Sequence, residues 1–187
     1  MSMNQAALTK SLHDHWMLFV IEGFVLIVLG LLAIAIPPLA TLGVTIFLGW
    51  LFLVSGAMGL VATFWGRAAP GFWWSLISAL LAIAAGLVLV ASPAGGAVSL
   101  TLVLIAFFVV EGVASIMYAL DHRQQLSGPW GWMLFSGLID LLLAVMILTG
   151  LPGSAAWALG LLVGINMLFG GSALIGMGLH ARNSAPA

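Results

Sequence analysis

The sequence predicts an all-α membrane protein with six transmembrane helices, built as three repeated helical hairpins with pseudo-threefold character. Of its 187 residues, 64% are hydrophobic and 5% are charged, whereas a soluble domain carries about 25% charged residues. Six long apolar runs follow one another, and prolines and glycines recur along them at nearly fixed spacing. We therefore expect the lipid bilayer, and not water, to surround most of the chain.

The repeat fixes the expected domain organisation. A proline and a glycine recur as Pro37 and Gly56, Pro93 and Gly112, and Pro152 and Gly171. Both residues recur at one interval from the first copy to the second, and at a slightly longer interval from the second to the third. We place the hairpins at residues 16–65, 72–120 and 130–179, inside a six-span domain of residues 16–180, and the hairpin turns at the three prolines. Residues 1–15 and 181–187 are expected to be polar tails.

Each apolar run is long enough to cross a bilayer, which takes about 20 helical residues. In chain order the runs cover residues 16–36, 40–65, 72–91, 97–120, 130–148 and 155–179. They are apolar on every face, so they do not show the alternation of a membrane β-strand. The first run exceeds the roughly 7–15 apolar residues of a signal peptide, and it matches internal runs. We therefore read it as a retained span.

The basic residues indicate the orientation. Lys10 precedes the first span, Arg67 and Arg123 lie in alternate connectors, and Arg182 follows the last span. The three proline connectors carry no charge. By the positive-inside rule, both termini and the two charged connectors are expected in the cytoplasm.

Several function classes lack support. The chain has no cysteine, which excludes disulfides and thiol chemistry, and its net charge of -1 offers no basic face for nucleic acid. We find no nucleophile–base pair, phosphate-binding loop or zinc motif. His13 and His15 diverge on a helix and have no evident third partner for a metal. We expect no enzyme activity, no catalytic or metal site and no cofactor.

Three carboxylates inside the predicted spans are the candidates for chemistry: Glu22, Glu111 and Asp140. An ionised side chain in hydrocarbon costs about 2.5–3.5 kcal/mol on insertion scales. No Lys, Arg or His lies within a span to pair with them, so we expect the protonated form, which can donate a hydrogen bond. Asn166 lies one helical turn before Gly170, the repeat counterpart of Glu111, and is a further polar candidate.

The repeat spacing gives these acids uneven counterparts. Glu111 corresponds to Ser55 and Gly170, Glu22 to Ser78 and Gly137, and Asp140 to Leu81 and Val25. No acid recurs in all three repeats, which argues against a symmetric acidic ring around a pore. Two interpretations remain open: neutral acids bonded within the bundle that fix helix register, or acids that bind a cation or relay protons.

Glycines mark the expected helix contacts. Small residues allow helix backbones to approach closely in lipid, and we assign packing roles to Gly56, Gly112, Gly160, Gly164 and Gly171. These positions form the seam of the hairpins and would also suit a contact with a second copy of the chain. The sequence indicates no other protein partner.

The pattern of Trp16, Gly23, Gly30 and Pro37, followed by Gly49-Trp50 and Ser55-Gly56, resembles the HdeD family of bacterial membrane proteins. The resemblance implies six spans in the bacterial inner membrane and a non-enzymatic role in acid resistance or general stress. It implies no catalytic residue. The alternatives from the residues themselves are a small transporter or proton-linked channel that uses Glu22, Glu111 and Asp140, or a membrane scaffold without a solute pathway.

Overall fold

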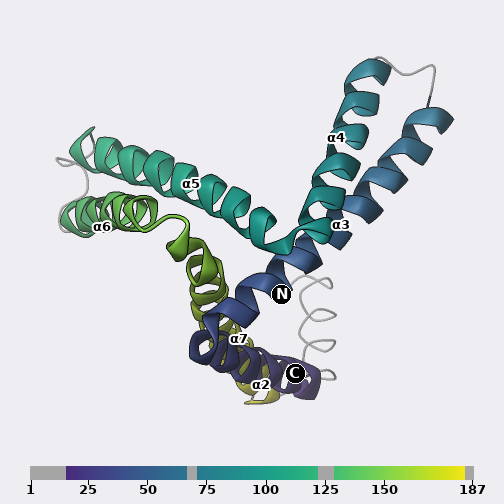
Figure 1. Cartoon of the computed structure of the whole chain (residues 1–187). Helices are drawn as coiled ribbons and strands as arrows, with labels where there is room; N and C mark the ends of the chain where they lie inside the picture. Colours follow the sequence, from purple (N-terminus) through teal and green to yellow (C-terminus); the bar gives the residue numbers. More distant parts are fainter. Residues whose placement is uncertain (1–15, 67–70, 122–128, 184–187) are drawn as a thin grey trace. The chain divides into compact units, whose positions relative to one another are not determined.

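The computed structural model describes residues 16–66, 71–121 and 129–183 (Figure 1). Its elements are α2 (Trp16–Ala35), α3 (Pro37–Trp65), α4 (Phe72–Ala91), α5 (Pro93–Asp121), α6 (Pro129–Thr149), the 3-10 helix η1 (Gly153–Ala156) and α7 (Ala158–Asn183). The described part of the chain holds six helices that are long and apolar enough to cross a membrane. The predicted six-span, all-α class is confirmed, and the threefold relation among the repeats stays a prediction. The N-terminal tail lies outside the described residues.

Two of the predicted hairpin turns are shorter than expected. Helix α3 begins at Pro37 and α5 at Pro93, so a single residue, Ile36 or Ser92, separates each from the preceding helix. Proline fits the first position of a helix because its missing N–H would have no partner there. The backbone N–H of Ser92 still donates to the carbonyl of Val88 at 3.0 Å, and that of Gly96 to Ser92 at 2.8 Å. Helix α3 therefore follows α2, and α5 follows α4, almost without a connecting segment.

The third turn is built differently. The Leu151–Pro152 peptide bond is cis, and η1 stands where the other repeats already have a long helix. The hydroxyl of the buried Ser154 donates to the carbonyl oxygen of Ile147 at 2.6 Å, which ties η1 to the end of α6. Helix α7 consequently begins at Ala158, well after Pro152, whereas α3 and α5 begin at their prolines.

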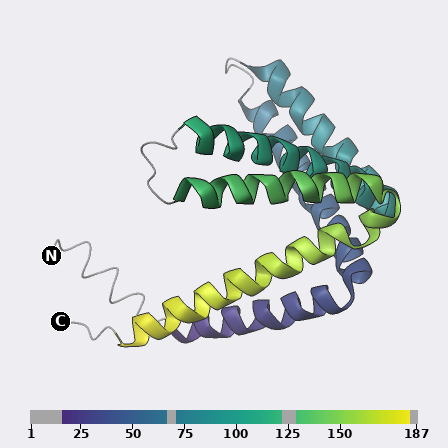
Figure 2. The same ribbon diagram turned by 90° about the vertical axis from the view of Figure 1, so that its left-hand side faces the viewer.

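The described residues divide into two compact units. The first contains residues 16–40 and 160–183, and the second contains residues 41–159 with the gaps given above. In the first unit α2 and α7 lie side by side and antiparallel (Figure 2). In the second, α3 packs on α4, and α5 packs on α6.

Glycines bring α2 and α7 into backbone contact. A methyl group placed on Gly23 would lie 2.6 Å from the carbonyl oxygen of Gly171, and one on Gly171 would lie 2.6 Å from that of Gly23. Two helical turns further along α2, Gly30 meets Gly164 in the same way, at 2.8 and 2.9 Å. Both separations are too short for any side chain, so glycine is required on both helices in these layers.

The second unit repeats this contact. Gly49 meets Gly86 between α3 and α4, at 3.3 and 2.8 Å, and Gly112 meets Gly137 between α5 and α6, at 2.8 and 2.7 Å. The other α3·α4 layer places a methyl group on Gly56 2.9 Å from the carbonyl oxygen of Ala79. Contact layers one heptad apart are the spacing at which helices cross at a small angle.

The packed pairs are offset from the repeat unit by one helix. The sequence repeat runs from one proline-linked hairpin to the next, but the close contacts join α3 to α4 and α5 to α6, across the charged connectors. Helix α7 contacts α2. Each second helix of a repeat therefore packs on the first helix of another repeat.

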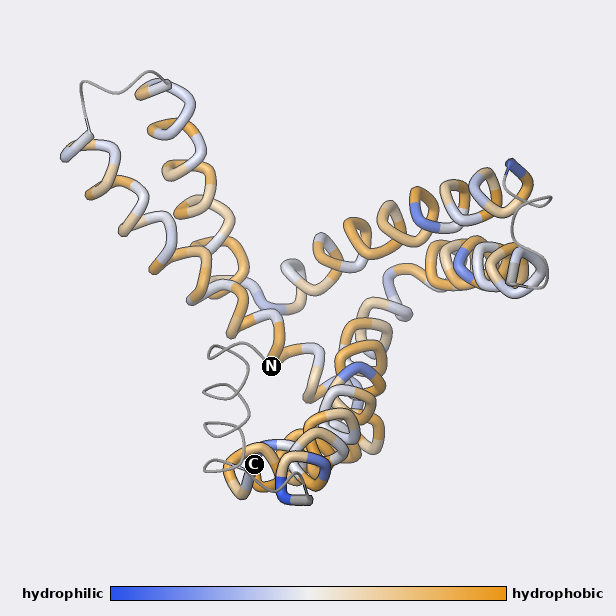
Figure 3. Tube along the Cα trace, turned by 180° about the vertical axis from the view of Figure 1, so that it is seen from behind, coloured by the Kyte–Doolittle hydropathy of each residue, from blue (hydrophilic) through white to orange (hydrophobic). Residues whose placement is uncertain are grey.

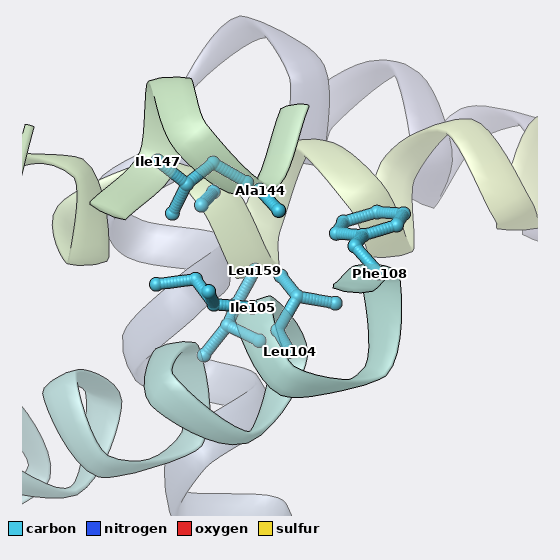
Figure 4. Packing of buried hydrophobic residues seen from close by; sticks show 7 residues of the cluster. Leu104, Ile105, Phe108, Ala144, Ile147 and Leu159 are labelled. Atoms are coloured by element: carbon cyan, nitrogen blue, oxygen red, sulfur yellow. The ribbon is translucent and has the colours of Figure 1, made fainter. Parts of the chain in front are cut away.

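One contact layer of the α5·α6 pair lacks glycine and belongs to the hydrophobic core. Ile105 stands on α5 where α3 has Gly49 and α7 has Gly164, and Ala144 stands on α6 in the position of Gly30 and Gly86. Large side chains fill this place in a buried cluster of Leu104, Ile105, Phe108, Ala144, Ile147, Ala158 and Leu159 (Figure 4). Elsewhere the helices present apolar residues on most of their circumference (Figure 3), as expected for lipid contact.

Candidate functional site

The three intramembrane carboxylates lie on outward faces of their helix pairs. Glu22 on α2 and Glu111 on α5 are exposed, and Asp140 on α6 is partly exposed. None of the three forms a hydrogen bond or ion pair with another residue in the described ranges. Asn166 on α7 is exposed as well.

The glycine layers give a structural register that corrects one alignment. Gly23, Ala79 and Gly137 occupy the same layer in their pairs, so the interval taken from the prolines is one residue too long for the first helix of the third repeat. The counterparts of Glu22 are therefore Ser78 and Ser136, and those of Asp140 are Ala82 and Leu26.

The extra residue of the third repeat falls at η1. The interval from Ala144 on α6 to Gly164 on α7 is one residue longer than the interval from Gly86 on α4 to Ile105 on α5. The same layers thus recur in all three repeats. The connector between α5 and α6 is longer than that between α3 and α4, and the turn between α6 and α7 is longer than the other two turns.

Glu111, Ser136 and Asp140 occupy one face of their helix pair. Glu111 and Ser136 immediately precede Gly112 and Gly137, which face each other across the α5·α6 contact. In an antiparallel pair the residues just before two facing positions are turned to the same side, because each is rotated by about 100° about an oppositely directed axis. Glu111 and Ser136 therefore share a face, and Asp140, one turn after Ser136, extends it.

The α3·α4 pair shows what this face looks like without acids. There the equivalent residues Ser55 and Ser78 line a groove of about 430 Å³. Its other walls are small or hydroxyl-bearing residues and one aromatic ring: Gly56, Gly59, Ala62, Thr63, Gly66, Phe72, Ser75, Ala79 and Ala82. Ala82 is the counterpart of Asp140, which supports the assignment of Asp140 to this face.

The structure thus brings two of the three acids together. Glu111 and Asp140 share one face of α5·α6, and the pairing of Gly112 with Gly137 and Leu141 puts them at a similar depth along the helices. Glu22 belongs to the other unit, where Gly23 faces Gly171, so Glu22 and Gly170, which precede these two glycines, share a face. Asn166 precedes Gly170 by one turn and so lies on the same face as Glu22.

The helix-packing candidates fall at different kinds of position. Gly56, Gly112, Gly164 and Gly171 all lie at close backbone approaches, and Gly160 is buried. Of the turn prolines, Pro37 and Pro93 begin helices, and Pro152 precedes η1. Each candidate thus lies at a helix contact, a buried site or a helix boundary.

Charged and imidazole groups near the helix ends form no metal site among the described residues. Arg182 on α7 places its guanidinium carbon 5.1 Å from the ring centroid of Trp16 on α2. This cation–π contact joins the end of α7 to the start of α2. His180 lies on the same turn of α7. His13, His15, His122, Lys10, Arg67 and Arg123 lie outside the described residues.

Buried hydroxyls are the polar feature that the sequence reading missed. Thr45 and Thr101 are fully buried, and each donates at 2.8 Å to a carbonyl one turn earlier, on Thr41 and Ala97. Their recurrence at the interval of the first two repeats was the available signal. Because each hydroxyl bonds its own helix, these residues fill small spaces without an unpaired group.

Two serines of the polar faces were missed as well. Ser75 lines the groove of α3·α4, and Ser136 lies beside Gly137 at the α5·α6 contact. Neither carries a charge, so neither stands out in an apolar run of the sequence.

The comparisons with known proteins agree with the internal repeat. The family described as "Short repeat of unknown function (DUF308)" matches residues 21–91 and again residues 77–149. The second match is displaced from the first by about the length of one hairpin repeat, so the family unit recurs along this chain. No solved structure matches the chain.

Curated relatives share one name. "Protein HdeD" of Escherichia coli K12, of Escherichia coli O157:H7 and of Shigella flexneri are each 27% identical to this chain over 152 residues. The alignments cover 80% of this chain and 78% of each relative. The resemblance inferred from the tryptophan, glycine and proline pattern is confirmed.

Proposed function

This chain belongs to the DUF308 short-repeat family and is an HdeD-like multi-pass membrane protein, and from this premise we propose a non-enzymatic role in survival of acid or general stress. The likeness to HdeD over four fifths of the chain is the observation that carries the proposal. The proposed location is the bacterial inner membrane, with both termini in the cytoplasm, as the distribution of Lys and Arg favours.

Survival at low pH tests the stress role. A strain that lacks the gene is expected to lose viability during an acid challenge, and a plasmid copy is expected to restore it. A matched plasmid copy with Gly171→Leu, which removes the α2·α7 contact, should restore survival less well at equal protein level. Unchanged survival of the deletion strain would contradict the stress role.

A proton or cation pathway is the second candidate, and one observation favours it. Glu111 on α5 and Asp140 on α6 lie on a shared face at similar depth, although they belong to different repeats of the sequence. Two protonatable groups so placed could pass a proton between them or bind one cation together.

Purified protein in vesicles with an enclosed pH-sensitive dye tests this pathway. Transport predicts a dye response to an imposed pH gradient that a Glu111→Gln and Asp140→Asn double variant abolishes. Absence of flux at every pH, with or without the acids, would remove the transport candidate and leave a scaffold without a solute pathway.

A further inference from the structure

The second unit carries two polar faces that its own described residues leave exposed. One is the carboxyl face of α5·α6, which we define by Glu111, Ser136 and Asp140. The other is the hydroxyl groove of α3·α4, which we define by Ser55, Ser75 and Ser78. Asp140 is partly exposed and the other five are exposed. Apart from Ser75, which lies in the first turn of α4, these residues occur well inside helices that are long and apolar enough to span a membrane.

Contact with lipid is energetically unfavourable for the carboxyl face. A carboxylate in hydrocarbon costs about 2.5–3.5 kcal/mol, and polar residues in spans face protein or water. The protonated acid also loses hydrogen bonds when it leaves water, so it needs a donor or acceptor from another helix. Two such acids on one face make protein contact there strongly favourable.

The hydroxyl groove has the complementary chemistry. A serine hydroxyl both donates and accepts, so it can pair with either form of a carboxyl group. Ser55 donates to the carbonyl of Phe52 at 3.2 Å and keeps its oxygen as an acceptor. Gly56, Gly59, Ala62 and Ala79 leave the groove open, with a volume of about 430 Å³. Small residues of this kind allow another helix to approach closely.

The two faces lie at the same level of the repeat along their helices. Ser55 and Glu111 each precede the glycine of the same contact layer, and on the partner helices Ser78 precedes Ala79 and Ser136 precedes Gly137. Two copies inserted with the same orientation can bring these faces together by a half turn about the membrane normal. That rotation sets α5 against α4 and α6 against α3. Glu111 then faces Ser78, and Ser136 faces Ser55.

We propose that the occupant of the hydroxyl groove is the carboxyl face of a second copy of this chain, and that the contact is reciprocal in a two-fold homodimer. Each copy supplies one groove and one carboxyl face, so the contact closes as a two-fold dimer when both faces of one copy meet both faces of the other. The dimer goes beyond the stress role, because it would hold whether or not the protein contributes to acid survival.

Disulfide trapping in membranes tests the dimer, because the chain has no native cysteine. Two differently tagged chains are co-expressed, one with Ser55→Cys and the other with Ser136→Cys, and mild oxidant is added. We expect a mixed disulfide that carries both tags. The matched control is Ala57→Cys with Leu138→Cys, which lie at the same depth but on the opposite side of the contact layer, and we expect little mixed product.

A second variant keeps the test independent of cysteine chemistry. Ser78→Phe fills the groove, yet Ser78 is exposed, so each helix pair should still fold. We expect it to reduce the cross-linked fraction about tenfold, as loss of about 1–2 kcal/mol of interhelical bonding would. Equal cross-linking in the control pair, or a Ser55→Cys, Ser136→Cys double variant that links only within one chain, would overturn the proposal.

Discussion

At the scale of residues, glycine backbones on neighbouring helices lie too close together for a side chain between them. Gly23 faces Gly171, and Gly112 faces Gly137, with no room for a side chain on either partner. Lipid offers no hydrophobic force to drive helices together, so close backbone packing supplies much of the attraction. Stability should therefore depend on particular glycines and not on glycine content.

Gly171 and its neighbour Gly170 give a matched pair of substitutions. A Cβ on Gly171 would lie 2.6 Å from the Gly23 carbonyl oxygen, whereas one on Gly170 meets nothing within 4 Å. We expect Gly171→Leu to destabilise the protein by about 1–3 kcal/mol or more, as overpacking does, and Gly170→Leu to have little effect. Reversible unfolding in mixed micelles measures both, and equal losses would refute the glycine contact.

Glu111 tests whether charge or hydrogen bonding matters in the span. Gln has the shape of a protonated Glu and keeps a donor and an acceptor. If the neutral acid is the resident form, Glu111→Gln should unfold at nearly the same denaturant concentration as the parent protein. A severe loss of stability in the same micelle assay would show that the ionised group is needed.

At the scale of elements, the third hairpin turn differs from the other two by one residue. Helices α3 and α5 begin directly at Pro37 and Pro93, but Pro152 is followed by η1 before α7 begins. The added residue would rotate α7 by about 100° if the helix simply continued. Instead η1 stands at the added residue, and Gly164 and Gly171 face α2.

Ser154 holds this turn, which leads to a stability prediction. Its hydroxyl donates to the Ile147 carbonyl at 2.6 Å, and Ser154 is buried. The backbone N–H of Leu151 donates to Leu148 instead, so Ser154→Ala leaves that carbonyl without its donor. We expect a loss of about 1–3 kcal/mol.

Thr149→Ala is the control for Ser154. Thr149 is exposed, and its hydroxyl bonds the carbonyl of Val145 within its own helix. Micelle unfolding should show a change well below that of Ser154→Ala. A larger effect at Thr149 would contradict the role given to η1.

At the scale of the whole molecule, the sequence predicts the helices better than their partners. Hydropathy and proline spacing give six spans with ends within a few residues of those observed, apart from the early starts at Pro37 and Pro93. Recurrence of Gly56, Gly112 and Gly171 marks contact positions. It cannot say which helix lies opposite, because each glycine has a suitable counterpart on several helices.

In the candidate site, too, the sequence predicts the residues but not which of them lie together. The acids are evident from their cost in lipid, but the shared face of Glu111 and Asp140 depends on the register of α5 against α6. Because the proline spacing is one residue too long for α6, it gives Gly137 as the counterpart of Glu22, whereas the contact layers give Ser136. The polar faces depend on how the two helices of each pair are aligned, and the glycine contact layers determine that alignment.

Six crossings by repeated units that alternate in direction fix which connectors face the cytoplasm, so labelling from each side of the membrane tests them. Single cysteines at Arg67, Arg123 and Gly153 are probed with an impermeant maleimide in right-side-out and inside-out vesicles; Gly153 is exposed, with nothing near its Cβ position. We expect Arg67→Cys and Arg123→Cys to label from the cytoplasmic side alone, and Gly153→Cys from the opposite side alone. Labelling of Arg67→Cys and Arg123→Cys from opposite sides would contradict it.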